Sequence, residues 1–460
     1  QKVEPMKVQN VTLAETKRLY HEDNFATAPQ LNMVWPTVEQ YSKDSYALDF
    51  LAEILADGKD APLYEVLVEE RKLTSQPIAF NNPGEIAGKF RIMVTANAGV
   101  DLDSIEAGIN EAFDRFEKEG ITSGDIERIK AGLETDFYNG ISSVLGKSFQ
   151  LANYDVFTGD PGFIEEDIAN IKAVTKEDVM GVYNKYIKDK NYVMTSFVPK
   201  GNVQLAAENS TKAEIVEEEI TENAPSEVAE TGDEQKDDVV QKTPSSFDRS
   251  VPPAMGETPQ LDIPETWMVE LDNKLDVFGI EQDELPLVTF SVVIEGGHLL
   301  DDLDNNGVAN LMSDIMMEGT AEKTPEELEE AIELLGANIN MYTGNESIVL
   351  RGTTLKRNFE ETMDLVEEIL LEPRWDQEEF ERIKTSTINT IKRREADPNS
   401  IANNVYDKIL YGEDHPFAYP ISGTVESVQN ITLQDLKDFY QKNFSPTVTS
   451  LHVVGDASKE

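Results

Sequence analysis

Histidine is the only side chain of this sequence with a nitrogen suited to zinc, and there are four: His21, His298, His415 and His452. Because the sequence has no cysteine, disulfides, thiolate zinc sites and a cysteine nucleophile are excluded. No His-x-x-x-His pair occurs, so no helix presents two imidazoles on one face. His298 follows two glycines at a predicted strand end and His415 lies in a Glu-Asp-His-Pro turn. We expect both to be polar surface groups, the alternative being that the fold brings them together around a metal.

A second candidate for chemistry is the segment Asp302-x-Asp304-x-Asn306-Gly307, which fits the first half of a calcium-binding loop. In such loops alternating oxygen side chains surround the ion, and the twelfth position is a bidentate glutamate. Here the twelfth position is Ser313. The sequence therefore favours an exposed acidic turn before a helix, with calcium binding as the alternative.

Charge and composition restrict the class of protein. The 460 residues include 88 Asp or Glu and 40 Lys or Arg, a formal net charge of −48, which argues against nucleic acid as a partner. With 39% hydrophobic residues the chain can form packed domains. No apolar stretch is long enough to span a membrane. The N-terminus has neither an initiator methionine nor a signal-peptide core, so we expect a soluble piece of a processed or truncated chain.

One segment differs from the rest. Between Glu208 and Asp238 there are twelve acidic residues, two lysines and no aromatic residue, and Pro and Ser become frequent from Pro244 to Pro264. Such a composition buries too little apolar surface to offset the entropy of ordering. We expect an acidic linker over residues 206–264, with a docking tail for a basic partner as the alternative. It separates two domains, 1–205 and 265–460.

The two domains resemble each other in sequence, which indicates an internal repeat. Three segments of the first domain recur in the second in the same order and at similar offsets. They are 125–130 with 379–384, 168–183 with 425–440 and, more weakly, 47–58 with 308–319.

Periodicity predicts the elements of each repeat. Residues 287–294, 339–343 and 347–353 have the β-branched and aromatic composition of strands, and amphipathic helices are predicted near 358–371, 376–395 and 401–411. Thr175 and Thr432 are predicted helix N-caps. The fold class that follows is α+β: two homologous domains, each an antiparallel sheet with helices packed on one face.

Residues 287–320 and 375–398, with Trp35-Pro36 and the segment 58–64, resemble the insulinase/pitrilysin family of zinc peptidases. In that family an H-x-x-E-H helix supplies two zinc ligands and a general-base Glu, and a further Glu ligand follows roughly 75 residues later. The resemblance implies the LuxS/MPP-like metallopeptidase fold. It also implies a parent of four homologous domains, arranged as two halves of a clamshell around a peptide, of which this chain resembles domains two and three.

The resemblance also implies that the catalytic positions are changed here. Asn310 and Asp314 take the two His positions and Ser313 the general-base position, and the later Glu ligand falls at Asn389 or Thr390. No nitrogen donor for zinc is left. We therefore expect no catalytic residue, metal or other cofactor in this chain, and a zinc site in the parent's missing N-terminal domain.

The family's assisting Arg and Tyr, which come from the facing domain, are absent as well. By alignment with the stretch from Leu67 to Ser75, their positions hold Val68 and Ser75. This pattern is typical of a second domain in a four-domain member, in which the fourth domain carries the assisting pair.

The function implied is that of the non-catalytic central portion of a zinc metallopeptidase that encloses and hydrolyses peptides. Expected partners are peptide substrates and the remaining domains of the same polypeptide or a homologous subunit, and a periplasmic or otherwise extracytoplasmic location follows from the resemblance alone. The alternative is a degenerate, non-hydrolytic family member that acts as a binding or assembly scaffold. A third hypothesis, hydrolysis by some other constellation, has no motif in its favour.

Overall fold

The computed structural model describes residues 7, 11–97, 99–214, 256 and 264–459. Most of the predicted acidic linker, residues 215–255 and 257–263, lies outside them. Its first residues belong to the first sheet, because the short strand Thr211–Lys212 pairs with the strand Lys17–Asp23. The two sheet-bearing halves of the chain belong to one compact unit.

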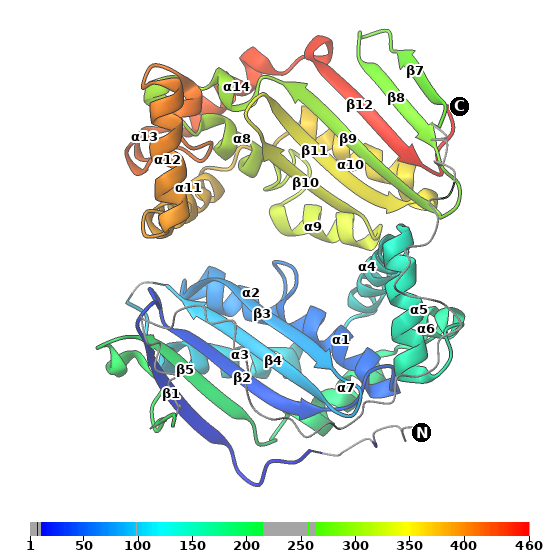
Figure 1. Cartoon of the computed structure of the whole chain (residues 1–460), viewed down its shortest axis with the longest axis vertical. Helices are drawn as coiled ribbons and strands as arrows, with labels where there is room; N and C mark the ends of the chain where they lie inside the picture. The colour runs from blue at the N-terminus through cyan, green and yellow to red at the C-terminus, as the bar shows by residue number, and fades with distance from the viewer. Residues whose placement is uncertain (1–6, 8–10, 98, 215–255, 257–263, 460) are drawn as a thin grey trace, which may run out of the picture. The chain divides into compact units, whose positions relative to one another are not determined.

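The first half contains one six-stranded sheet, ordered β3-β4-β2-β5-β1-β6 (Figure 1). Its strands are β1 (Lys17–Asp23), β2 (Gln30–Thr37), β3 (Thr74–Pro83), β4 (Gly88–Ala96), β5 (Val193–Pro199) and β6 (Thr211–Lys212). Its helices are α1 (Lys43–Ala56), α2 (Pro62–Tyr64), α3 (Leu102–Glu119), α4 (Ser123–Gly140), α5 (Val144–Thr158), α6 (Ile164–Ala173) and α7 (Lys176–Val182). Helices α2 and α7 continue into π-type turns, Glu65–Glu70 and Tyr183–Ile187.

The second half repeats this plan with the order β10-β11-β9-β12-β8-β7. Its strands are β7 (Thr266–Glu270), β8 (Asp276–Glu281), β9 (Leu287–Glu295), β10 (Asn338–Thr343), β11 (Ser347–Leu355) and β12 (Thr449–Gly455). Its helices are α8 (Val308–Met316), α9 (Pro325–Leu334), α10 (Phe359–Leu371), α11 (Gln377–Arg394), α12 (Pro398–Tyr411), α13 (Val425–Asn430) and α14 (Leu433–Asn443). The predicted strands and long helices are all confirmed.

The α+β fold class is confirmed, with one difference in the sheets, which are mixed. The pair β1 and β5 and the pair β8 and β12 run parallel, and the other principal pairs are antiparallel. Because β5 and β12 enter the sheet after a helical connection, they can lie parallel to β1 and β8, which a tight hairpin does not allow. In each half the helices bury the apolar face of the sheet in one core.

Local signals explain where key helices begin. Thr175 and Thr432 cap α7 and α14 as predicted, and each exchanges hydrogen bonds with an aspartate three residues later, Asp178 and Asp435. None of the helices in the described part of the chain has the length and apolar character that crossing a membrane requires.

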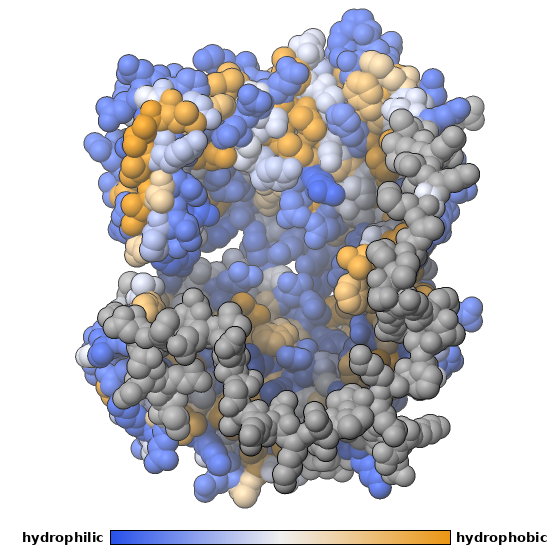
Figure 2. Space-filling view, in the orientation of Figure 1, coloured by the Kyte–Doolittle hydropathy of each residue, from blue (hydrophilic) through white to orange (hydrophobic). Residues whose placement is uncertain are grey.

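Helix α12 is unusual because none of its residues is buried. Its apolar residues Ile401, Val405, Ile409 and Leu410 are exposed at helical spacing. Figure 2 shows hydrophilic residues over most of the visible face and an apolar strip where α12 lies. An apolar face of this kind is typical of a contact surface.

Candidate functional site

Helix α8 carries Asn310, Ser313 and Asp314, which are predicted to be changed catalytic positions, and its start is fixed by one carboxylate. Asp301 accepts hydrogen bonds from the backbone N–H groups of Gly307 (2.8 Å) and Ala309 (2.9 Å). Gly307 has φ 105°, a left-handed conformation that favours glycine. The acidic turn thus precedes a helix as predicted, but the carboxylate that engages the helix is Asp301, whereas Asp302 and Asp304 are exposed.

Asn310 and Asp314 lie one turn apart on α8, as their spacing predicts, and contact each other. The Asn310 amide donates to the Asp314 carboxylate at 3.0 Å. Ser313 points into the core instead. It is fully buried, its hydroxyl donates to the Ala309 carbonyl at 3.1 Å, and it lies 2.5 Å from the Thr343 hydroxyl of β10. A serine hydroxyl held by a carbonyl and a second hydroxyl has no basic partner and cannot replace a general-base carboxylate.

The Asp314 carboxyl has an altered proton affinity. Burial raises its pKa to about 6, with a smaller contribution in the same direction from the negative charge of Glu318, while the Asn310 amide lowers it. A carboxyl of this kind exchanges protons near neutral pH. It has a single amide partner, and the described residues contain no group of three or more His, Cys, Asp or Glu side chains that could hold a metal ion.

Asn389 and Thr390 lie on α11, a helix that packs against α8. Asn389 is exposed and Thr390 half-buried, and Thr390 accepts a hydrogen bond from Arg393 on the same helix. Among the described residues, no hydrogen bond joins either of them to α8. The fold therefore brings Asn310, Asp314 and Asn389 onto two packed helices without assembling them into a bonded site.

Sequence reasoning missed the charged group next to these positions. Glu318 lies one turn beyond Asp314, and each of its carboxylate oxygens contacts a cation: Arg382 of α11 at 2.6 Å, and Lys59 of the first half in an ion pair. The side chains of Glu318 and Lys59 are 13% and 16% exposed, so this pair is largely removed from water. The signal available in the sequence was the i, i+4 spacing of Glu318 from Asp314.

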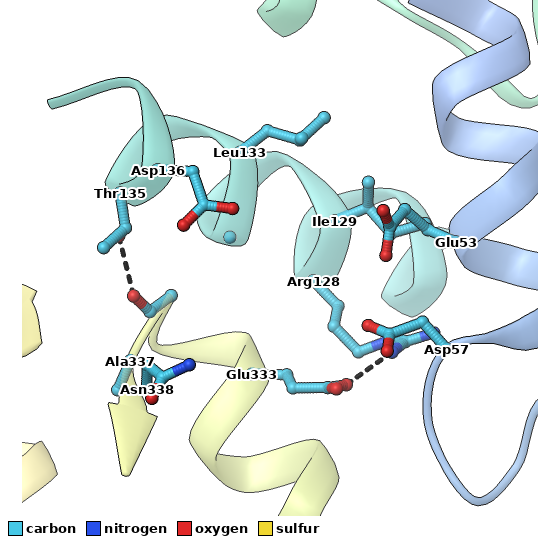
Figure 3. Close-up of a pocket in the computed structure, with 12 residues that line it drawn as sticks. Glu53, Asp57, Arg128, Ile129, Leu133, Thr135, Asp136, Glu333, Ala337 and Asn338 are labelled. Atoms are coloured by element: carbon cyan, nitrogen blue, oxygen red, sulfur yellow. Dashed lines mark hydrogen bonds and ion pairs between the residues drawn. The ribbon is translucent and has the colours of Figure 1, made fainter. Parts of the chain in front are cut away.

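A second mixed-charge cluster joins the two halves at α4 and α9. Arg128 of α4 pairs with Glu333 of α9, and Glu53, Asp57 and Asp136 lie around them in a cavity of about 180 Å³ (Figure 3). Burial raises the pKa of Glu53 to about 8 and that of Glu333 to about 7. One arginine thus faces several carboxyls, and Glu53 and Glu333 exchange protons near neutral pH.

The backbone also joins these two helices. The buried Thr135 hydroxyl donates to the Gly336 carbonyl at 2.7 Å. Gly336 has φ 57°, and a Cβ there would lie 2.5 Å from the Ala131 carbonyl oxygen, so glycine is required. These features describe a structural contact between the halves and contain no nucleophile activated by a base.

The prediction that His298 is a surface group is wrong, since its side chain is fully buried. The two preceding glycines turn the chain inward with φ 128° and 56°. A Cβ at Gly297 would lie 2.5 Å from the Gly344 carbonyl oxygen, so only glycine allows this approach. The Gly296-Gly297 pair was the sequence signal, and it was interpreted as a strand end only.

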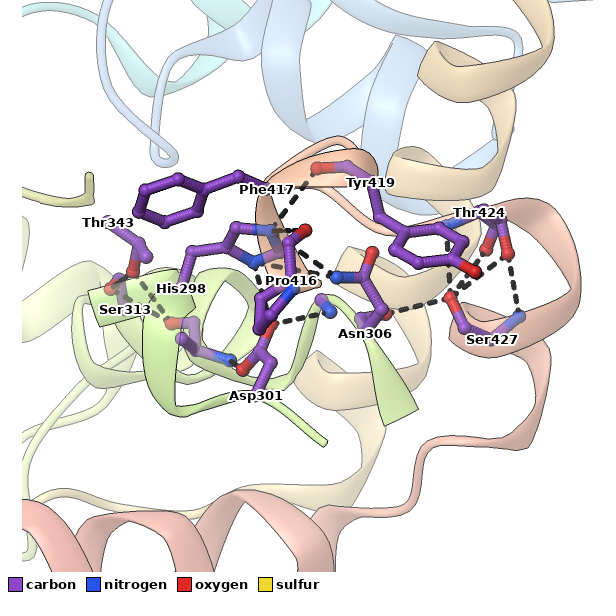
Figure 4. Close-up of polar contacts among 12 residues, drawn as sticks. His298, Asp301, Asn306, Ser313, Thr343, Pro416, Phe417, Tyr419, Thr424 and Ser427 are labelled. Atoms are coloured by element: carbon purple, nitrogen blue, oxygen red, sulfur yellow. Dashed lines mark hydrogen bonds and ion pairs between the residues drawn. The ribbon is translucent and has the colours of Figure 1, made fainter. Parts of the chain in front are cut away.

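Both ring nitrogens of His298 face hydrogen-bond acceptors (Figure 4). Nδ1 lies 3.2 Å from the Asp301 carboxylate, and Nε2 lies 2.9 Å from the Pro416 carbonyl oxygen and 3.2 Å from that of Tyr419. Burial lowers the pKa of His298, but the bond to Asp301, its charge and the two carbonyls outweigh burial and raise the pKa overall. His298 therefore ties the loop before α8 to residues 416–419, and this environment favours the protonated form of its ring.

His298 and His415 do not meet around a metal. Phe417 contacts both rings, stacked at 6.4 Å from the His298 ring and edge-on at 5.0 Å from that of His415. His415 is half-buried, and its Nδ1 accepts the Phe417 backbone N–H at 3.1 Å. The two histidines thus have structural roles in this segment.

The two positions that are predicted to match the family's assisting pair hold Val68 and Ser75. Val68 lies half-buried in the π-type turn Glu65–Glu70, and Ser75 is exposed on β3. Neither side chain forms a hydrogen bond among the described residues.

Two family models match the sequence. The model described as peptidase M16 inactive domain matches residues 2–133, and the model described as insulinase (peptidase family M16) matches residues 278–423. Together they cover more than half of the chain, and each falls in one of the two sheet-bearing halves.

Individual relatives are more distant. The chain is 25% identical over 182 residues to mitochondrial-processing peptidase subunit beta of Saccharomyces cerevisiae, covering 40% of this chain and 39% of that protein. It is 28% identical over 171 residues to a protein of Helicobacter pylori named non-peptidase homolog YmxG, covering 37% and 39%. The chain thus spans about two fifths of the length of these curated relatives.

A solved structure of a peptidase M16 inactive domain from Pseudomonas fluorescens is 25% identical, covers 42% of this chain and 47% of that one, and has a TM-score of 0.41. The family models and the resemblance seen in the sequence lead to the same assignment. The chain belongs to the insulinase (M16) family of peptidases.

Proposed function

We propose that this chain is the non-catalytic central portion of an insulinase-type zinc metallopeptidase, and that the zinc site lies outside it. The observation that carries the proposal is the state of α8. Its two histidine positions hold Asn310 and Asp314, its general-base position holds the core residue Ser313, and cations from Lys59 and Arg382 neutralise the adjacent Glu318. A site without imidazole donors gives zinc no suitable ligands.

The order of the family matches supports the central position. The inactive-domain model precedes the peptidase model along the chain, as expected for domains two and three of a four-domain parent. In this proposal the domains are 1–205 and 265–460, the segment 206–264 tethers them, and the remaining domains complete a chamber for peptides. The exposed apolar faces of α12 and α5, which include Ile409 and Phe149, would pack against those domains.

Peptide would be held in this proposal at an open sheet edge. The described strands at the edges are β3 and β6 in the first sheet, and β10 and β7 in the second. An extended peptide can add to such an edge through main-chain hydrogen bonds.

A second candidate function is favoured by one comparison. A relative of similar identity is named a non-peptidase homolog, which supports a parent that binds or assembles other proteins without hydrolysing them. In that case the ion pairs at Glu318 and Glu333 would stabilise a scaffold and nothing more.

One experiment separates the two candidates. Zinc content and hydrolysis of a mixture of unstructured peptides are measured on this chain and on its full-length parent, with and without a chelator. We expect the chain to be inert and metal-free, and the parent to carry about one zinc and to lose activity with chelator. A metal-free, inert parent would establish the scaffold instead, and zinc-dependent cleavage by this chain alone would overturn both.

A further inference from the structure

The internal repeat allows the same place to be inspected in both cores. Strands β2 and β9 occupy the same place in their sheet orders. Strand β2 lies between β4 and β5, and β9 lies between β11 and β12. In the first sheet Met33 pairs with Met194, and in the second Val292 pairs with Leu451. These pairs are structurally equivalent and fix the alignment of the neighbouring positions.

Two residues further along β2, the first core holds a large aromatic group. Trp35 is 2% exposed, and its ring lies 5.1 Å from Tyr192 and 6.3 Å from Phe113. The equivalent position on β9 is Ile294, which pairs with Thr449 of β12. The aromatic rings of Trp35 and Tyr192 in the first core are thus replaced in the second by Ile294 and Thr449.

The covering helix is shorter in the second half as well. Helix α3 has 18 residues and its equivalent α10 has 13. The last turns of α3 carry Phe116, which is buried against Tyr183, whereas α10 ends at Leu371, which is 65% exposed. The second core therefore lacks both the buried aromatic group and the last turns of its covering helix.

The result is an open hollow of about 460 Å³ in the second half, a volume in the usual range of ligand sites. Its lining is mostly apolar side chains from β9, β12, α10 and the end of α14. They include Val292, Ile294, Val366, Leu370, Phe444 and Leu451. In the interior, the Tyr440 hydroxyl already donates to the Leu370 carbonyl at 2.7 Å. An apolar group suits this interior.

The rim of the hollow is acidic. Asp364 and Glu367 are exposed on α10 and belong to the lining, and the lining contains no lysine or arginine. The chain as a whole carries a formal charge of −48. An occupant that enters this rim therefore gains from positive charge next to its apolar group.

We infer that this hollow, defined by Ile294, Leu370 and Leu451 with the rim residues Asp364 and Glu367, binds an aromatic side chain of a partner peptide that carries lysine or arginine beside it. The hollow lies where the first core is filled by its own Trp35, so the partner's ring takes the place of an internal side chain. The site is separate from the changed catalytic positions on α8.

The test is a binding titration with three blocked tripeptides, acetyl-Lys-Phe-Lys-amide, acetyl-Lys-Ala-Lys-amide and acetyl-Glu-Phe-Glu-amide. Saturation-transfer NMR and calorimetry measure binding to the whole chain. We expect saturable binding of the Lys-Phe-Lys peptide with Kd of roughly 0.1–1 mM, and at least about tenfold weaker binding of the other two.

Variants locate the site. Ile294→Trp fills the hollow with the residue of the first core and should abolish binding, because the ring and the peptide compete for the same space. The double variant Asp364→Asn, Glu367→Gln should weaken binding about fivefold and reduce its salt dependence. Glu360→Gln, an exposed change on α10 outside the lining, is the matched control and should have no effect.

Each other outcome overturns the inference. These are no saturable binding up to about 10 mM, equal binding of the Glu-Phe-Glu peptide, or unchanged binding by both the folded Ile294→Trp variant and the rim variant. Should Ile294→Trp fail to fold, the rim variant decides alone. The binding assay needs neither metal nor hydrolysis. A negative result therefore does not contradict the proposed function, and an inert full-length parent does not contradict this binding site.

Discussion

Helices α1 and α8 are equivalent in the repeat, and their comparison shows two ways of keeping a polar helix face next to a core. The alignment of 47–58 with 308–319 places Asp49 opposite Asn310 and Glu53 opposite Asp314. In the first half both positions are acids, and burial raises the pKa of Asp49 to about 7 and of Glu53 to about 8. In the second half an amide and an acid form a hydrogen bond.

The difference teaches that buried acids at equivalent places of two helices can have pKa values raised to different extents. In the first half burial is the main cause of both raised pKa values, with smaller contributions from the charge of Asp167 at Asp49 and from Asp57 at Glu53. In the second half burial raises the pKa of Asp314 to about 6, and the Asn310 amide acts in the opposite direction. In both halves an arginine of the long helix lies by the next acid, Arg128 near Asp57 and Arg382 at Glu318.

The largest expected effect comes from making the first core resemble the second. Trp35→Ile should lower the free energy of unfolding by about 3–4 kcal/mol, because it removes a buried aromatic ring and leaves a cavity. Chemical denaturation of the variant and of the unsubstituted chain measures this difference in the free energy of unfolding. Ile294→Val in the second half is the control and should cost about 1 kcal/mol. A loss below about 1 kcal/mol for Trp35→Ile would show that the first core collapses around the gap.

His298 has no counterpart in the first half, and its removal should cause the next largest loss of stability. His298→Ala should cost about 2–3 kcal/mol at pH 6, because it leaves the buried Asp301 without its cation. Exposed His452→Ala is the control and should change stability by less than about 0.5 kcal/mol.

The pH dependence of that difference follows from the raised pKa of His298. The stabilisation is complete below the unfolded pKa near 6.5 and is lost as pH rises through the folded pKa, which is higher. Denaturation of wild type and His298→Ala between about pH 5.5 and about pH 9, a range of roughly 3.5 pH units, should therefore show converging stabilities. A constant difference across this range would mean that the imidazole is not ionised.

A smaller effect, this time a gain in stability, is expected from a substitution in α1. An unfolded Asp titrates near 3.9, whereas Asp49 holds its proton up to a pKa of about 7. The stability from the protonated carboxyl is present at acid pH and is lost as pH rises through that value. Asp49→Asn should therefore raise the Tm at pH 8 and leave it nearly unchanged at pH 4. An unchanged or lowered Tm at pH 8 would contradict the raised pKa.

The smallest effect is expected at the equivalent acid of α8. Asp314→Asn should raise the Tm at pH 8 by less than Asp49→Asn does, since the pKa of Asp314 is raised only to about 6. Thermal denaturation of the two variants side by side measures the ranking. A larger gain at Asp314 than at Asp49 would reverse the comparison of the two helices.

The sequence by itself determined the repeat, the strands and long helices predicted between residues 287 and 411, and the Thr175 and Thr432 caps. These depend on residues close together in the chain, whose periodicity and hydrogen bonding are local. For the same reason it predicted that Asn310 and Asp314 share a helix face.

Only the tertiary structure decided which polar groups are buried and which distant groups pair. The burial of His298 depends on carbonyls from residues 416 and 419, and the pairing of Lys59 with Glu318 joins segments from different halves. The hollow beside Ile294 arises from a short helix and two small side chains that are far apart in the sequence. Burial, and with it pKa and cavity volume, is a property of packing between distant segments, so no local pattern of residues could reveal it.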